Sequence, residues 1–183
     1  CSGVGMFSSF QCSGVGTSTH YKIKVRFYQL SLTGDTMNGF DLLINRNLEA
    51  EKLHQAISSV LEAAPETILV CHEVPEVPLA TSISLLVVLS ELLGDFILLL
   101  AFYLKDSYVG IYDPIEIAKR LSTQLECQCL ISDDDINPYT MLRVDTTAQV
   151  QPVALSVASF QEDKYVVESV IQYRGKLLYS APK

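Results

Sequence analysis

The chain has 183 residues, of which 49% are apolar, and its 13 basic and 21 acidic side chains give a formal net charge of −8. A chain of this length buries enough surface to fold without disulfides or metals, and its composition excludes collagen-like, disulfide-scaffold and disordered proteins. The acid excess argues against a protein that mainly binds nucleic acid or an anionic membrane, because such binding needs a positive field. Five cysteines without the spacing of a disulfide framework favour a reducing compartment.

Residues 1–20 differ in kind from the rest of the chain. They hold no acidic residue, no Lys and no Arg, and the sequence Cys-Ser-Gly-Val-Gly occurs twice, at Cys1–Gly5 and Cys12–Gly16. Such low-complexity material cannot pack a core, so we expect a flexible leader at 1–20 and a single domain at 21–183. Three origins of the leader stay open: a non-native extension, a native tail, or a processed lipoprotein terminus with lipid on Cys1.

Apolar and basic side chains alternate along Tyr21–Leu32, which predicts a half-buried strand with a basic solvent face. The apolar face holds Ile23, Val25 and Phe27. The basic face holds Lys22, Lys24 and Arg26. We expect Phe40–Asn45 to form a second strand, antiparallel to the first.

A helix is predicted next, over Leu48–Ala64, because apolar residues recur there at spacings of three and four. Asn47 is available as its N-cap and Pro65 follows its end. The following elements are expected to be a central strand at Thr67–His72, a second helix at Ala80–Leu93 closed by Gly94, and a hairpin of Phe96–Leu104 with Tyr108–Tyr112.

The most apolar stretch, Ile83–Leu104, has 22 residues and is long enough to cross a bilayer as a helix. Glu91 and Asp95 lie near its middle without a basic residue inside the run. Because an acid at the centre of a membrane helix costs about 2.5 to 3.5 kcal/mol, we predict two buried elements of a soluble fold instead.

Asp113-Pro114-Ile115-Glu116 is the clearest local signal, with a capping Asp, a proline at the first helical position and Glu116 able to close a capping box. The helix is expected to reach Leu125. The remaining elements are predicted to be strands at Cys127–Ser132, Thr140–Val144, Gln149–Phe160 and Tyr165–Tyr173, then Lys176–Ser180. This order predicts an α+β domain with about three helices and a mixed or mostly antiparallel sheet.

Two clusters of side chains resemble metal-binding sites, but neither has the full ligand pattern. Asp133–Asn137 begins like a calcium-binding loop, but Pro138 replaces the required glycine and Val144 the terminal acid. Cys127 and Cys129 could join Cys71 and His72 around zinc, but paired Cys-x-x-Cys spacing is missing, so core packing is favoured. We therefore expect no metal and no cofactor. No catalytic motif occurs in the predicted domain, and we expect no catalytic residue.

The acidic charge is concentrated in one stretch. Between Lys52 and Lys119 the chain has one basic residue, Lys105, and nine acidic ones, which accounts for the whole net charge of −8. Such a surface maintains solubility or steers a basic partner into contact.

Three segments, Gly110–Ala118, Leu130–Asp133 and Ile136–Tyr139, resemble uncharacterised bacterial proteins of toxin systems. With its small size and acidity, the chain is similar to the immunity proteins of these systems, including those of contact-dependent growth inhibition. The resemblance implies a non-enzymatic cytoplasmic protein that binds one cognate toxin or nuclease domain and blocks it. It carries no residue over by position.

For such a partner we expect contacts from acids near loops, with exposed aromatics as anchors. These are Glu73, Glu76, Asp106, Tyr108, Asp133, Asp134, Asp135 and Tyr139. Two alternatives stay open. One is a small hydrolase or transferase with an acid-lined pocket. The other is a homodimer or larger oligomer in which the basic strand face meets the acidic stretch of another copy. Nucleic-acid and membrane partners are not expected.

Overall fold

The computed structural model describes residues 28–32, 35–75, 80, 82–105, 113–133 and 137–171. These residues form an α+β fold, as predicted, with one large sheet and three α-helices. The strands of the large sheet are β1 (Tyr28–Leu32), β2 (Asp35–Ile44), β3 (Ile68–Cys71), β4 (Leu85–Glu91), β6 (Leu98–Lys105), β7 (Cys129–Ser132), β8 (Thr140–Val144), β9 (Val150–Leu155) and β11 (Val167–Val170). The helices are α1 (Ala50–Leu61), α2 (Pro114–Leu125) and α3 (Val157–Gln161), with a 3-10 turn at Pro65–Thr67. β5 (Leu93–Gly94) and β10 (Lys164–Tyr165) pair separately.

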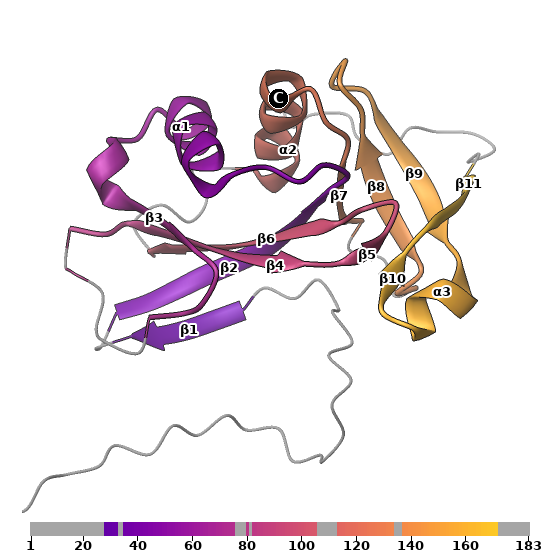
Figure 1. Cartoon of the computed structure of the whole chain (residues 1–183), viewed down its shortest axis with the longest axis horizontal. Helices are drawn as coiled ribbons and strands as arrows, with labels where there is room; N and C mark the ends of the chain where they lie inside the picture. Colours follow the sequence, from indigo (N-terminus) through magenta and orange to yellow (C-terminus); the bar gives the residue numbers. More distant parts are fainter. Residues whose placement is uncertain are drawn as a thin grey trace, which may run out of the picture.

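The large sheet is built around β2. Its strand order is β11-β9-β8-β7-β2-β6-β4-β3, and β1 pairs with β2 as well. All neighbours are antiparallel except β3 and β4. β6 pairs with β2 on one side. On the other side, β1 pairs with the first half of β2 and β7 pairs with the end of β2. In Figure 1, β2, β4 and β6 run across the view, while β8, β9 and β11 stand steeply, as the twist of a large sheet requires.

α1 and α2 lie side by side on one face of the sheet (Figure 1). Both are amphipathic, and their apolar sides pack on the alternate residues of β2, β4 and β6 that face them. Phe40 and Phe102, which pair across β2 and β6, stack with ring centroids 4.7 Å apart in this core. The main core therefore lies between two helices and the centre of the sheet.

The other face of the sheet carries two smaller apolar clusters. Met37, Leu86 and Val88 form one, near the start of β2. The second lies near the end of β2 and includes Leu43 and Phe96 together with residues of β9 and β10; Phe160 of α3 packs against it. Figure 1 shows α3 and β10 at this end, away from α1 and α2.

The predicted helix at Ala80–Leu93 is wrong, because the structure has strand β4 there. Leu85–Leu89 are buried in succession, since β4 lies between β3 and β6 and has apolar clusters on both of its faces. A strand buried on both faces loses the alternation that distinguishes it from a buried helix. The strand prediction for Thr67–His72 holds for Ile68–Cys71, but this strand lies at the edge of the sheet and not at its centre.

The first helix is shorter than predicted. It begins at Ala50, with Glu49 and not Asn47 at the N-cap, and it ends at Leu61 because Glu62 adopts a left-handed conformation with φ of 51°. The predicted strand Gln149–Phe160 is β9 followed by helix α3, and Tyr165–Tyr173 contains β10 and β11 with Val166 between them. Predicted strands at Tyr108–Tyr112 and Lys176–Ser180, and residues 1–27, lie outside the described residues.

The predicted start of the helix after Asp113 is confirmed. Asp113 Oδ1 accepts a hydrogen bond from the main-chain N–H of Ile115 at 2.9 Å, and Pro114 is the first helical residue. Glu116 pairs with Lys119 at 2.5 Å and not with the start of the helix. Within the described part of the chain, no helix has the length and apolar character needed to span a membrane.

Candidate functional site

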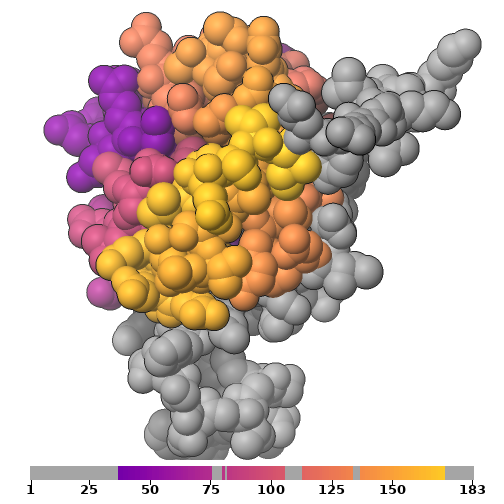
Figure 2. Space-filling view, turned by 90° about the vertical axis from the view of Figure 1, so that its right-hand side faces the viewer, coloured from indigo at the N-terminus to yellow at the C-terminus, as the bar shows by residue number. Residues whose placement is uncertain are grey.

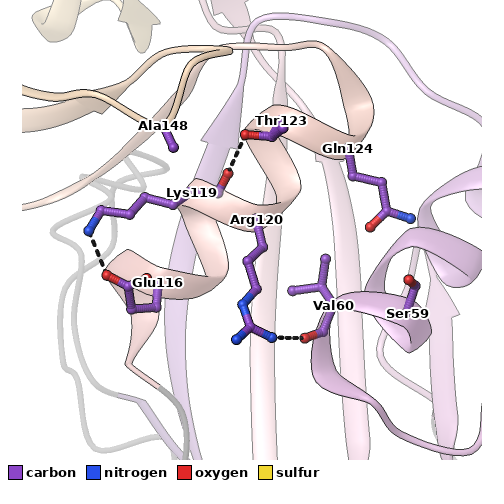
Figure 3. Close-up of a pocket in the computed structure, with 8 residues that line it drawn as sticks. All are labelled: Ser59, Val60, Glu116, Lys119, Arg120, Thr123, Gln124 and Ala148. Atoms are coloured by element: carbon purple, nitrogen blue, oxygen red, sulfur yellow. Dashed lines mark hydrogen bonds and ion pairs between the residues drawn. The ribbon is translucent and has the colours of Figure 1, made fainter.

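An open groove of about 480 Å³ runs between the outer sides of α1 and α2 (Figure 3). Ser59 and Val60 of α1 line one wall, and the other wall is the polar side of α2, with Ala148 of the β8–β9 turn at one end. The residues of α2 in this wall are Glu116, Lys119, Arg120, Thr123 and Gln124.

The two cations of the groove are held by neighbours. Arg120 Nη1 donates to the main-chain oxygen of Val60 at 3.1 Å and lies 3.7 Å from Glu62. Lys119 pairs with Glu116, as Figure 3 shows. Because Val60 O is one of the last carbonyls of α1, the guanidinium supplies a hydrogen-bond donor and a favourable charge at that helix end. The hydrogen bond from Arg120 therefore joins α2 to α1. The residues that line the groove include no nucleophile paired with a base.

Three of the predicted contact residues lie in the described structure. Glu73 is exposed and follows β3, Asp133 is half-buried and follows β7, and Tyr139 is half-buried just before β8. The other five, Glu76, Asp106, Tyr108, Asp134 and Asp135, lie outside the described residues.

The structure does not gather these residues into one cluster. Glu73 follows β3 at one edge, and Asp133 follows β7, four strand positions away, which corresponds to about 19 Å across the sheet. Asp133 and Tyr139 lie on the same β7–β8 connection. Lys105, the last residue of β6, lies toward the same end of the sheet, because β6 and β7 both run antiparallel to β2. We call Lys105, Asp133 and Tyr139 the β7–β8 end.

Tyr139 belongs to a short chain of aromatic rings. Its ring lies edge-on to Phe160 of α3, with centroids 5.5 Å apart, and Phe160 lies edge-on to Tyr165 at 5.6 Å. Leu155 N–H donates to the main-chain oxygen of Tyr139 at 2.7 Å. Figure 2 views the side of the molecule that is formed by β9, α3 and β11, in orange to yellow. Tyr139 is therefore a supported side chain and not a loose loop residue.

The sequence favoured core packing over zinc binding for Cys127 and Cys129, and the structure places both in the core. Cys127 and Cys129 are buried together in the core below the helices, whereas Cys71 packs on the opposite face of the sheet. A hydrogen bond from Cys129 and the charge of Arg46 lower the pKa of the Cys127 thiol against the effect of burial. The same contact and burial raise the pKa of Cys129 well above its usual value. Among the described residues, no group of three His, Cys, Asp or Glu side chains could hold a metal ion.

Asp41 is the buried charged group that sequence reasoning missed. It lies in the middle of β2 with 2% of its surface exposed, and burial raises its pKa to about 7. The available signal was an aspartate inside the apolar run Phe40–Ile44 of a predicted strand.

Acidic side chains outnumber basic ones, 21 to 13, and the formal net charge of the chain is −8. Three ion pairs join described residues: Glu116 with Lys119, Glu62 with Arg120, and Glu162 with Lys164. Most carboxylates of the folded body have no basic partner among the described residues.

Comparison of this chain with protein-family models, curated proteins and solved structures finds no match.

Proposed function

We propose that this chain is a non-enzymatic cytoplasmic protein that binds and neutralises a basic bacterial toxin domain, as immunity proteins do. The formal net charge of −8, which the stretch between Lys52 and Lys119 accounts for, is the observation that carries the proposal. Surface carboxylates in such excess accelerate association with a basic protein, because complementary fields steer the encounter.

The β7–β8 end is the surface that we assign to the toxin. In the sequence, Asp134 and Asp135 directly follow Asp133, and Asp106 and Tyr108 follow Lys105. An aromatic anchor beside several carboxylates suits a basic surface, since tyrosine and arginine side chains are enriched among the residues that contribute most to interface energies. Glu73, at the far edge strand, belongs to this surface only if the toxin spans the sheet.

The groove between α1 and α2 is a weaker candidate for this contact. Its two cations already have partners within the fold, and a basic toxin would meet Lys119 and Arg120 there. Like charges across an interface lower affinity. Among the described residues of the β7–β8 end, Lys105 is the only basic one.

The experiment uses the toxin domain encoded beside this chain in its own genome. Co-expression should restore growth of cells that express that toxin, and purified protein should bind it with an association rate that falls as salt rises. Asp134→Lys with Asp135→Lys should slow association at least tenfold at low salt. The matched control, Glu91→Lys with Glu126→Lys, makes the same change of charge at exposed residues toward the opposite end of the sheet.

Equal slowing by both double variants would refute the assigned surface but keep the acidic partner-binding role. Growth inhibition that persists at full expression of this chain, together with no measurable binding, would refute the function itself. Thermal melting of each variant shows whether the fold is intact.

A further inference from the structure

β3 is the last strand at one edge of the large sheet as described, and the direction of its main-chain groups follows from the hydrogen bonds of β4. Both main-chain groups of a strand residue face the same neighbouring strand, and successive residues face opposite neighbours. Leu92 N–H, directly after β4, donates to Ile97 O on the β6 side. Even-numbered residues of β4 therefore face β6, and odd-numbered residues such as Leu85 face β3.

The main chain of Ile68 points outward from the sheet. In a parallel pair, a residue that faces its neighbour bonds to the two residues that flank the one opposite it. Leu85 lies opposite Ile68, so it bonds to the neighbours of Ile68 and not to Ile68 itself. The direction of Thr67 O agrees, because it accepts a hydrogen bond from Ser84 N–H at 2.8 Å. The N–H and C=O of Ile68 thus face away from β4, and those of Val70 do the same.

Both outward groups of Ile68 are bound within the fold. Its N–H donates to Pro65 O of the 3-10 turn, which Figure 1 shows between α1 and β3. Its C=O lies 3.1 Å from His54 Nε2 of α1, and the same nitrogen lies 3.0 Å from Pro65 O. Because both carbonyl oxygens can only accept, Nε2 carries the hydrogen and shares it between them. His54 and Pro65 therefore close the main chain of β3 where the strand begins.

The sequence of β3 has no protection of its own against pairing with another chain. Edge strands offer main-chain groups to other strands, and natural proteins block them with charged side chains, prolines or a covering element. β3 has the sequence Ile-Leu-Val-Cys, which is apolar and rich in strand-forming residues and has neither a charge nor a proline. The cover supplied from α1 and the 3-10 turn takes the place of these devices.

The two contacts of Ile68 block the pairing of β3 with β3 of a second copy. In an antiparallel pair about a two-fold axis, Ile68 of one copy would lie opposite Val70 of the other. Opposed residues of this kind exchange both of their hydrogen bonds, so every bond in this register needs a main-chain group of one Ile68. With Val70 opposite Val70, bonds remain only at that central pair, because the next outward pair again includes Ile68.

We propose that His54 guards the β3 edge and prevents the sheet from continuing into a second copy of this chain. α1 holds the histidine in place, since the neighbouring Leu53 and Ile57 are fully buried in the core. A second copy is the partner that this edge must exclude, because it is present wherever the protein is and has the same uncharged strand. Repulsion between two chains of net charge −8 weakens as salt screens it, so charge alone does not protect the edge. The guard is independent of the proposed toxin binding.

The first test is sedimentation of the full chain over a range of protein concentrations, at high salt so that repulsion between copies is screened. His54→Ala should associate at least tenfold more tightly than the wild type, because Ile68 O becomes available to a second strand. His54→Gln should behave as the wild type, since its amide can still donate a hydrogen bond. Gln55→Ala, at the adjacent exposed position of α1, is the matched control and should also leave the association unchanged.

A proline at Val70 shows whether the association uses β3. Val70 N–H points away from β4, so Val70→Pro removes a donor to a second strand without removing a bond to β4. In the His54→Ala chain, Val70→Pro should therefore restore the sedimentation of the wild type. Circular dichroism and thermal melting of each variant report whether it is folded.

Equal association of the wild type and His54→Ala would overturn the guard. Association of His54→Ala that persists after Val70→Pro would assign the contact to another surface and would overturn it as well. Nitrogen NMR of the wild type gives a readout that needs no variant to fold. At a pH where the His54 ring is neutral, Nε2 should carry the hydrogen and Nδ1 should not, and the opposite tautomer would refute the contact with Ile68 O.

Discussion

Arg46 Nη1 donates a hydrogen bond to the main-chain oxygen of Leu125, the last residue of α2, at 3.3 Å. Arg120 makes the equivalent contact with Val60 near the end of α1. Neither helix has a basic residue in its own last turn, so an arginine from elsewhere supplies the donor and the positive charge that a helix C-terminus favours. These two contacts tie the β2–α1 connection to α2 and α2 to α1.

Replacing Arg46 by methionine, which retains an apolar stem, should lower the free energy of unfolding by about 1 kcal/mol, because a charged hydrogen bond at a helix end is lost. Urea unfolding followed by circular dichroism measures this change. Lys52→Met, at an exposed position of α1, is the control and should change stability by less than about 0.5 kcal/mol. An equal loss in both variants would show that the Leu125 contact contributes nothing specific.

The buried Asp41 makes stability depend on pH. Its native pKa is about 7, above the unfolded value of 3.8, so the native state holds the proton over this range while the unfolded state loses it. The contribution of Asp41 to the free energy of unfolding should therefore fall by about 1.4 kcal/mol per pH unit as pH rises from about 4 to 7. Asp41→Asn should abolish this contribution, and urea titrations at several pH values would contradict the prediction if the slope were the same in both proteins.

Gly39→Ala should destabilise the centre of the sheet. A Cβ atom at Gly39 would collide with the main-chain oxygen of Phe102 and lie 3.1 Å from Cδ1 of Tyr103. Because the collision is with main chain of the paired strand β6, relief requires a backbone shift, and we expect a loss of about 1 to 3 kcal/mol. The exposed Ser90→Ala on β4 is the comparison in thermal and urea unfolding, and a stable Gly39→Ala protein would show that β2 and β6 separate easily.

Thiol labelling should separate the cysteines by their positions in the fold. Cys127 and Cys129 are buried in the core below the helices, so a thiol reagent should modify them only as fast as the protein unfolds. Cys71 is half-buried on the other face and should react at least tenfold faster. Mass spectrometry of peptides after timed labelling measures each site, and rapid modification of Cys129 in the native protein would contradict the described core.

Local signals in the sequence predicted the elements whose ends are determined by neighbouring residues. Asp113 and Pro114 begin α2 because a capping side chain and a proline act within one turn. β8 also has its predicted bounds, Thr140–Val144. At the N-cap of α1, the side chain of Glu49 makes no capping hydrogen bond. The start of this helix therefore could not be predicted from a capping residue in the sequence.

The candidate site was only partly predictable for a related reason. Acidic loop residues can be counted from the sequence, but Glu73 and Asp133 are separated by four strand positions, and strand order is a long-range property. The same limit hid Asp41, whose burial depends on neighbours from β4 and β6 that lie about 50 to 60 residues away in the chain.

By itself the sequence determined the α+β class and the acid excess, because these depend on composition and on periods of two to four residues. Only the tertiary structure decided that Leu85–Glu91 is a strand, since burial on both faces removes the period. It also decided that Asp41 is buried in the middle of β2, because register and strand order join residues that are distant in the chain.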